Sequence, residues 1–248
     1  MKKIIGQLVI RRRLTKWAER GYFPNTLFRA PPGMGKTLLA LCWGEIIKEH
    51  TGKKLYHYMC KKTEPAPVTE EVIVLDEIHN LPNEEDFYNQ DFGIIGCTTE
   101  GAPISEAFQS RFHVFWLDPY NVNDLAGITK MYAPQLMSDI CFVVALRARS
   151  SPRTARKLGE ELQVLLPKEK QTKALAVQTL EKEMGVYEGG YTKNDFQYLK
   201  VLQQLGRASL HTIAVSSRLP EMVIRDEVEP FLLQNSLVRI SSRGRELV

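Results

Sequence analysis

The octapeptide APPGMGKT occupies residues 30–37, between an apolar run and a segment of helical periodicity. It fits the phosphate-binding pattern GxxxxGK[ST] at every fixed position except the first, where Ala30 replaces glycine. Gly33 and Gly35 allow backbone N–H groups to turn inward on phosphates, at the N-terminus of the helix that follows. Because such a loop needs a strand before it and a helix after it, the octapeptide predicts a parallel α/β fold.

Short apolar runs with helical segments between them support this fold. The runs occupy residues 25–30, 55–59, 72–75, 93–97 and 112–117, and a helix is expected over 38–48. Residues 121–184 show helical spacing and no strand, which indicates a second domain, and the Gly-rich stretch 185–191 indicates a linker. The order after it, helix, helix, turn, longer helix and β-like end, is typical of a winged helix-turn-helix.

The composition is ordinary for a globular protein, with 44% hydrophobic and 25% charged residues. No apolar run approaches the roughly 20 residues that a membrane span needs, so we expect a cytoplasmic protein that does not enter the membrane. The four cysteines, Cys42, Cys60, Cys97 and Cys141, are widely spaced and form no CxxC pair. They predict core thiols, with neither a zinc site nor a disulfide framework.

The net charge of +4 favours no partner by itself, but the positive residues are clustered. The clusters lie in residues 2–20, 147–157 and 239–245. Each of them could form a solvated helix face or contact an anionic partner.

Four residues carry the predicted phosphate chemistry. Lys36 is expected on the β- and γ-phosphates and Thr37 on Mg²⁺. Asp76 and Glu77 end the apolar run 72–75, which suits an acid that holds magnesium and a second acid that polarises the attacking water. An ordinary helix start after a strand is the alternative for this acidic pair.

Six blocks follow one another along the chain, namely APPGMGKT, LDEIHNL, GCTTE, SRF, SSPRTARKL and EPFLLQNSLVRISSRGRE. In these blocks the chain resembles the RuvB family of AAA+ ATPases, over nearly its whole length. The resemblance implies an α/β fold with an AAA+ P-loop domain (1–118), a helical lid domain (119–185) and a C-terminal winged-helix DNA-binding domain (186–248). It also implies ATP and Mg²⁺ as cofactors, and a homo-oligomeric, hexameric ring that translocates DNA or migrates junctions.

The resemblance also implies roles for single residues. Thr99 resembles the sensor 1 residue, although a strand-end threonine can simply cap a helix. Arg111 resembles an arginine finger that acts on the neighbouring subunit, with a surface ion pair as the alternative, and Arg153 resembles the sensor 2 arginine, with a basic helix face as the alternative. The expected nucleotide-binding set is Ile4, Ile5, Pro32, Gly33, Met34, Gly35, Lys36, Thr37, Leu38 and Arg153, in which Ile4 and Ile5 belong to the adenine-proximal motif IIGQ.

The last domain predicts a DNA contact through its wing. Residues 220–233 would form the recognition helix, and Arg239, Arg243 and Arg245 would contact the DNA backbone without reading sequence. The recognition helix is acidic, with four carboxylates at Glu221, Asp226, Glu227 and Glu229. Acidic side chains disfavour entry into the major groove, and a winged helix used for protein contact remains the alternative.

One departure from the family concerns the stretch after Asp76. Only 23 positions separate Asp76 from Thr99. In RuvB this stretch carries the β-hairpin that docks on RuvA, so the resemblance implies a compact variant without the hairpin and without a RuvA-like partner. A helicase loader or recruitment switch, of the kind a phage or mobile element carries, is the rival to the motor. A phosphotransferase kinase is disfavoured, because Arg111, Arg153 and a winged helix have no role in it.

Overall fold

The structure, a computed structural model, describes residues 4–90, 93–99, 101–167, 169 and 171–248 of the chain. The chain forms two compact units. Unit 1 consists of the described residues up to Ile128 together with Ser150–Lys157, and unit 2 consists of Thr129–Arg149 and Leu158–Val248.

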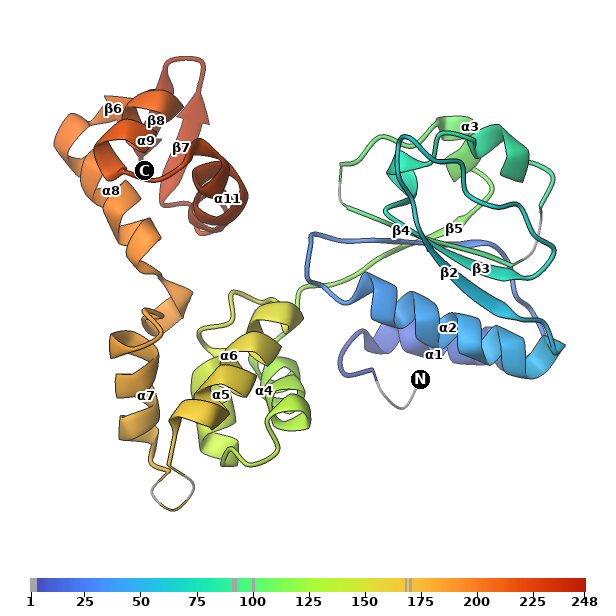
Figure 1. The fold of residues 1–248 in the computed structure, drawn as a ribbon, viewed down its shortest axis with the longest axis horizontal. Coiled ribbons are helices and arrows are strands. Elements are labelled where there is room, and N and C mark those ends of the chain that lie inside the picture. The colour runs from blue at the N-terminus through green and yellow to red at the C-terminus, as the bar shows by residue number, and fades with distance from the viewer. Residues whose placement is uncertain (1–3, 91–92, 100, 168, 170) are drawn as a thin grey trace. The chain divides into compact units, whose positions relative to one another are not determined.

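A five-stranded parallel sheet of order β2-β3-β4-β1-β5 forms the centre of unit 1 (Figure 1). Its strands are β1 (Thr26–Arg29), β2 (Leu55–Met59), β3 (Val72–Asp76), β4 (Ile94–Thr98) and β5 (His113–Trp116). Strands β1, β3 and β4 are buried along their whole length, as expected where helices and loops cover both faces of a parallel sheet. In register, Arg29 lies opposite Thr98 and Leu75 opposite Gly96, so the carboxyl ends of these three strands meet at one edge.

Helices α1 (Leu8–Glu19) and α2 (Lys36–Thr51) cover one face of this sheet (Figure 1). α1 buries Ile10, Leu14 and Ala18, which recur every four residues on one side of the helix. The other face carries the short helix α3 (Glu106–Gln109) and the two 3₁₀ turns η1 (Ile78–Asn80) and η2 (Glu84–Phe87). Phe87 and Phe108 are fully buried in the core on this side.

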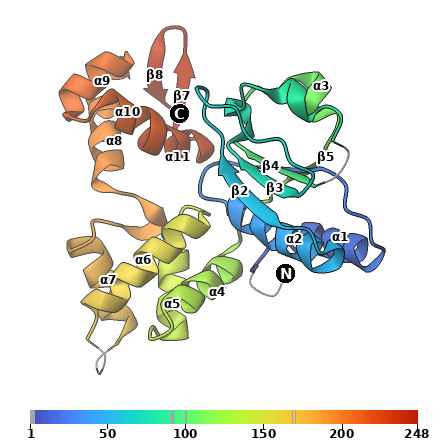
Figure 2. The same ribbon diagram turned by 45° about the vertical axis from the view of Figure 1, so that its right-hand side comes forward.

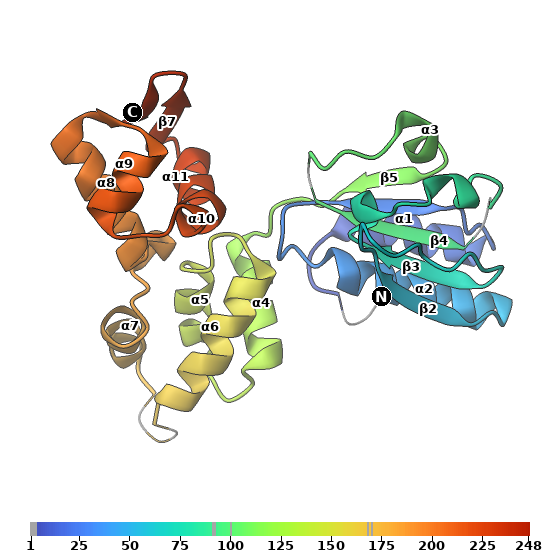
Figure 3. The ribbon, with the colours of Figure 1, turned by 45° about the horizontal axis from the view of Figure 1, so that its top comes forward.

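The helical part of the chain contains α4 (Val122–Tyr132), α5 (Ser138–Ala145), α6 (Pro152–Leu165) and α7 (Lys173–Lys182) (Figure 3). α5 and α7 pack against each other. Gly159 of α6 lies so close to α4 that an added Cβ would come within 2.8 Å of the Thr129 methyl group. A residue without a side chain is therefore needed where these two helices meet.

The C-terminal part of unit 2 is a winged helix (Figure 2). Its elements are η3 (Glu188–Gly190), α8 (Lys193–Leu205), β6 (Arg207–Ala208), α9 (Leu210–Ser217), α10 (Glu221–Val223), the π-helical turn η4 (Ile224–Val228), α11 (Glu229–Gln234), β7 (Val238–Ser241) and β8 (Gly244–Leu247). The strands form an antiparallel sheet of order β6-β8-β7. Pro230 explains the π turn, because a proline has no N–H for the preceding turn and its ring crowds a carbonyl there.

The predicted α/β fold with a helical region and a C-terminal winged helix is confirmed. The expected run 55–59 coincides with β2, and the run 72–75 is extended by Asp76. The residue ranges of the three domains remain a prediction. Three of the four cysteines are buried. Within the described ranges, no helix is both long and apolar enough to cross a bilayer.

Candidate nucleotide site and DNA-binding surface

The loop between β1 and α2 has the backbone that a phosphate cradle requires. Gly33 and Gly35 adopt φ values of 82° and 83°, and Gly35 is the N-cap residue of α2. A Cβ on Gly33 would lie 3.0 Å from Ser151 Oγ and 3.3 Å from Arg153 Cβ. L side chains disfavour this φ at both positions, and at Gly33 a Cβ would also be crowded, so both glycines are required by geometry as well as by the motif.

Lys36 is the first residue of α2, and its ammonium group is turned back into the loop. Nζ donates to the carbonyl of Ala30 at 2.8 Å and to that of Pro31 at 3.1 Å. Burial lowers the pKa of Lys36, and the negative charge of Glu77 offsets part of this effect. The amine is thus a buried donor, held by carbonyls that phosphate oxygens could replace.

Thr37 and Asp76 are adjacent. Thr37 Oγ1 donates to Asp76 Oδ2 at 2.7 Å, and the other carboxylate oxygen accepts the Glu77 N–H at 3.1 Å. A hydroxyl and a carboxylate at this separation supply the hard oxygen donors that Mg²⁺ prefers. The two residues therefore fit the predicted magnesium site, although His57 Nε2 also lies 3.6 Å from Asp76 Oδ2.

Glu77 follows β3 with a left-handed φ of 51°. Its Oε2 atom is buried and has no hydrogen-bond partner among the described residues. His79 Nδ1 is 3.5 Å from that oxygen, beyond a good hydrogen bond, and 3.0 Å from Thr98 Oγ1. A buried carboxylate oxygen without a donor is suited to accept a hydrogen bond from a water molecule beside the phosphates.

Thr98 is the last residue of β4, and Thr99 is the first residue after it. Thr98 is fully buried, and its hydroxyl is the one paired with His79. Thr99, the predicted sensor 1 residue, is half-buried in the loop after the strand and accepts the Ala102 N–H with its carbonyl. Both lie at the same edge of the sheet as Asp76.

Arg111, the predicted finger, is exposed between α3 and β5. Its guanidinium lies over the ring of Tyr88, 4.6 Å from the centroid. The Tyr88 ring lies in turn 6.0 Å from the ring of buried Phe108. This stack restricts a long, exposed side chain that would otherwise sample many rotamers.

Arg153 lies beside the phosphate loop, within unit 1. Pro152 begins α6, as a proline at N1 is expected to do, and the Arg153 N–H donates to the Gly33 carbonyl at 3.3 Å. The positive charge of Arg153 contributes to lowering the pKa of Lys36. The predicted sensor 2 arginine is thus placed next to the predicted phosphate site.

The N-terminal motif IIGQ is attached to the segment after β5. Gln7 exchanges two hydrogen bonds with the Asp118 backbone, at 2.7 Å and 3.0 Å. Ile4 is buried, and Ile5 lies beside Gly127 of α4. Of the remaining predicted nucleotide contacts, Met34 is buried whereas Pro32 and Leu38 are exposed.

In the wing, two of the three predicted DNA-binding arginines pair with carboxylates. Arg239 Nε donates to Glu246 Oε1 at 2.7 Å. Arg245 Nε donates to Glu229 Oε1 at 2.8 Å, and both residues are largely buried, with 19% and 6% of their side chains exposed. Arg243 lies at the turn of the β7–β8 hairpin, is exposed, and has no side-chain partner among the described residues. Only Arg243 therefore presents an uncompensated charge at the tip.

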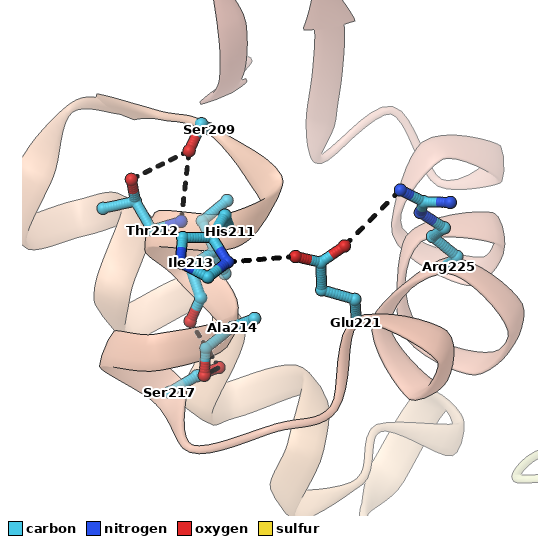
Figure 4. Close-up of polar contacts among 8 residues, drawn as sticks. All are labelled: Ser209, His211, Thr212, Ile213, Ala214, Ser217, Glu221 and Arg225. Carbon is cyan, nitrogen blue, oxygen red and sulfur yellow. Dashed lines mark hydrogen bonds and ion pairs between the residues drawn. The ribbon is translucent and has the colours of Figure 1, made fainter.

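The helix-turn-helix compensates part of its acidic charge. Glu221 lies between His211 and Arg225, 3.2 Å from His211 Nδ1 and 3.5 Å from an Arg225 nitrogen (Figure 4). With Glu229 bound to Arg245, the exposed carboxylates left on the predicted recognition helix are Asp226 and Glu227. These two still disfavour a close approach to DNA bases.

Sequence reasoning assigned no role to Tyr88, His79 or His57. Tyr88 gives no local signal, because its contact with Arg111 joins residues 23 positions apart. His79 stands in the block LDEIHNL, and this was the one available signal for its place between Glu77 and Thr98.

Known proteins similar to this chain agree on one family. Residues 188–248 match the RuvB C-terminal winged helix domain. The "Holliday junction branch migration complex subunit RuvB" of Wolinella succinogenes is 29% identical over 97% of this chain and 85% of its own length. The subunit of the same name from Helicobacter pylori strain 26695 is 30% identical over 89% of this chain and 78% of its own length.

Solved structures give the same result. The Thermotoga maritima RuvB Holliday junction branch migration motor superposes with a TM-score of 0.76 and 25% identity, covering 98% of this chain and 92% of the other. The agreement extends over the P-loop sheet, the helical region and the winged helix. With its P-loop, acidic pair and winged helix in the order and geometry described, this chain belongs to the RuvB family of AAA+ proteins.

Proposed function

We propose that the chain is an ATP-hydrolysing motor that acts on DNA as a homo-oligomeric, hexameric ring, by translocation or by branch migration of junctions. The observation that carries the proposal is the convergence of Lys36, the Thr37–Asp76 pair, Glu77 and Arg153 at one edge of the sheet, in a RuvB-family chain. The relatives are named as subunits of a Holliday junction branch migration complex. None of the four cysteines, all of them among the described residues, is in a disulfide, which suits a reducing compartment such as the cytoplasm.

The residues of the site divide the work of hydrolysis. Lys36 binds the β- and γ-phosphates in place of its loop carbonyls, and Thr37 and Asp76 hold Mg²⁺, which neutralises charge on the phosphates when bound. Glu77 orients the attacking water and takes up its proton, while Thr99 lies at the same edge as a polar sensor. Arg153 contacts the γ-phosphate from its own subunit, and Arg111 reaches the pocket of the next subunit to stabilise the charge of the transition state.

Two substitutions test this division. Lys36→Ala should abolish nucleotide binding, whereas Glu77→Gln should keep binding and lose hydrolysis, because only the second acts on the water. Binding is measured with a fluorescent ATP analogue and turnover by phosphate release. A Glu77→Gln variant that hydrolyses ATP close to the parental rate would refute the assignment.

The DNA contact is proposed for the wing tip and is led by Arg243. Phosphate contacts release counterions, so Arg243→Ala should lower duplex affinity equally on unrelated sequences and make the salt dependence shallower by about one unit of slope. Arg239→Ala is the matched control, since this arginine is also exposed but already bound to Glu246. Equal loss in both variants would assign the contact to the whole hairpin.

One experiment distinguishes the motor hypothesis from the switch hypothesis. ATPase rates are measured with no DNA, single strand, duplex and four-way junction, together with branch migration of the junction without added partners. A motor hydrolyses ATP faster on its DNA and migrates the junction. ATPase without migration would instead favour a helicase loader or recruitment switch.

We further propose that the chain works without a RuvA-like partner. The connection from β3 to β4 contains η1 and η2 and, in its described residues 77–90 and 93, no strand. The alignment with the Wolinella relative spans 296 positions, more than the 248 residues of this chain, so that relative carries segments missing here. Stimulation of the ATPase by a host RuvA, or micromolar binding in a pull-down, would refute this proposal.

A further inference from the structure

Arg149 follows α5 in the helical part of unit 2, and its guanidinium is bound at several points of the winged helix. Nε donates to the Gly190 carbonyl at 2.8 Å, and Nη1 donates to the Glu227 carbonyl at 3.1 Å. Nη2 donates to the carboxylate of Asp195. The same group lies over the Phe231 ring, 3.9 Å from its centroid. A planar guanidinium can satisfy such a divergent set, whereas an ammonium group cannot.

The winged-helix residues around the Arg149 guanidinium fit its charge and its size. Asp195 is fully buried at the start of α8, where it also closes the capping box with Thr192, so the guanidinium supplies its countercharge. Gly190 has a φ of 87°, and a Cβ there would lie 2.9 Å from both the Arg147 carbonyl oxygen and Arg149 Cγ. Only glycine leaves room for the approach of Arg149.

One of these contacts reaches the predicted recognition helix at its irregular point. The Glu227 carbonyl belongs to η4, the π-helical turn between α10 and α11. Such turns are rare and are frequently found at functional sites. Arg149 therefore fixes the segment after α5 to the place where the predicted recognition helix departs from α-helical geometry.

The other side of Arg149 leads to the nucleotide site through the backbone. Arg149 and Ser150 both have left-handed φ values, 51° and 55°, which non-glycine residues adopt only where their surroundings hold them. The chain passes from unit 2 to unit 1 between these two residues. Three positions after Ser150, the Arg153 N–H donates to the Gly33 carbonyl of the phosphate loop.

We propose that Arg149 is a positioning residue for Arg153. Through this positioning, Arg149 couples the state of the nucleotide site to the recognition helix of the winged helix. The proposal rests on the proposed function, in that Arg153 senses the γ-phosphate. A short strained segment, held at one end by the winged helix and at the other by the phosphate loop, transmits a displacement of Arg153 to the Glu227 carbonyl. By linkage, bound DNA then changes nucleotide affinity by the same factor.

The test is a thermodynamic cycle on the full-length chain. The Kd for a junction DNA is measured with ADP and with the ATP analogue ATPγS, and the ratio of the two values is the coupling. In the parent we expect a ratio of about fivefold or more, within the usual range of coupling between sites. In Arg149→Lys the ratio should fall to within about twofold of one, because the ammonium keeps the charge near Asp195 but cannot bridge the three acceptors.

Gly190→Ala is the second variant and should cause the same loss without changing any charge. Arg147→Lys is the matched control. Arg147 is a buried arginine of the same segment, but its side chain donates to the Val143 carbonyl and to Glu181, both of which lie outside the winged helix. Its ratio should remain parental. Amide exchange of α8 and α11 is followed in every variant to show that the winged helix stays folded.

Three outcomes would overturn the inference. They are a parental ratio in Arg149→Lys, an equal loss in Arg147→Lys, and an equal weakening of DNA binding with both nucleotides that leaves the ratio unchanged, which is the mark of a purely structural clamp. If Arg149→Lys unfolds the winged helix, the ratio is measured in Phe231→Leu, which removes the ring under the Arg149 guanidinium. A lowered ratio there would support the inference, and a parental ratio would overturn it. Failure of the proposed function looks different, because the parent itself would then lack ATPase activity or DNA binding.

Discussion

Replacing Arg245 should destabilise the winged helix and should not merely remove a DNA contact. Glu229 is 4% exposed, and its carboxylate accepts Arg245 Nε at 2.8 Å and the Tyr198 hydroxyl at 3.0 Å. Burial, followed by the charge of Glu229, raises the pKa of Tyr198, so that hydroxyl remains a donor. Removing Arg245 leaves a buried carboxylate with one neutral donor.

The magnitude follows from the burial. Breaking a buried ion pair by removing one partner costs about 3–5 kcal/mol. The lower end applies here, because the Arg245 side chain is 19% exposed and Tyr198 still donates to Glu229. For a domain of this size, a loss of about 3 kcal/mol lowers the melting temperature by roughly 12–24 °C.

The assay is calorimetry of the full-length chain, with amide exchange of α8 and α11 to assign the transition to the winged helix. Arg245→Ala should melt lower by that amount, and Arg243→Ala should melt as the parent does. The triple variant Tyr198→Phe, Glu229→Leu, Arg245→Met replaces the whole network with apolar groups and should recover most of the loss, since buried ion pairs are often replaceable in this way. A parental melting temperature for Arg245→Ala, together with a shallower salt dependence of DNA binding, would refute the reasoning.

Other consequences concern catalysis, metal and acid. Arg111→Ala should lower kcat for ATP by about 10³-fold or more, and mixing it with Lys36→Ala subunits should restore part of the activity, whereas inactivity at every ratio would place Arg111 within its own subunit. Thr37→Ala should raise the Mg²⁺ concentration needed for half-maximal ATPase but spare ADP binding in EDTA; equal loss of both would contradict a metal role. A hydrogen bond from Arg207 on β6, and after it one from Arg239 on β7, lower the pKa of Glu246 from its usual 4.5. Its stabilisation of the hairpin is therefore complete above pH 4.5 and lost as the pH falls through the lower folded value, so amide exchange in β7 and β8 should accelerate there in the parent and not in Glu246→Gln.

Much of the geometry of the candidate nucleotide site could be predicted from the sequence because its requirements are local. The positive φ values of Gly33 and Gly35, the lysine that begins α2, and two acids at the end of a buried strand all lie within single segments of the chain. Parallel strands then bring their carboxyl ends together without further information. The same reasoning predicted the strand positions to within about one residue, as the run 55–59 and β2 illustrate.

The partners of long side chains were decided only by the tertiary structure. Arg245 and Arg243 look alike in the sequence, yet alternation along β8 turns Arg245 toward Glu229, 16 positions away, and leaves Arg243 at the turn. Arg149 looked like part of a basic cluster, and it lies instead against Asp195, 46 positions away. The sequence shows that an arginine carries a positive charge. Whether that charge is exposed to solvent or paired with a buried carboxylate depends on which residue the fold places within about 3 Å of it.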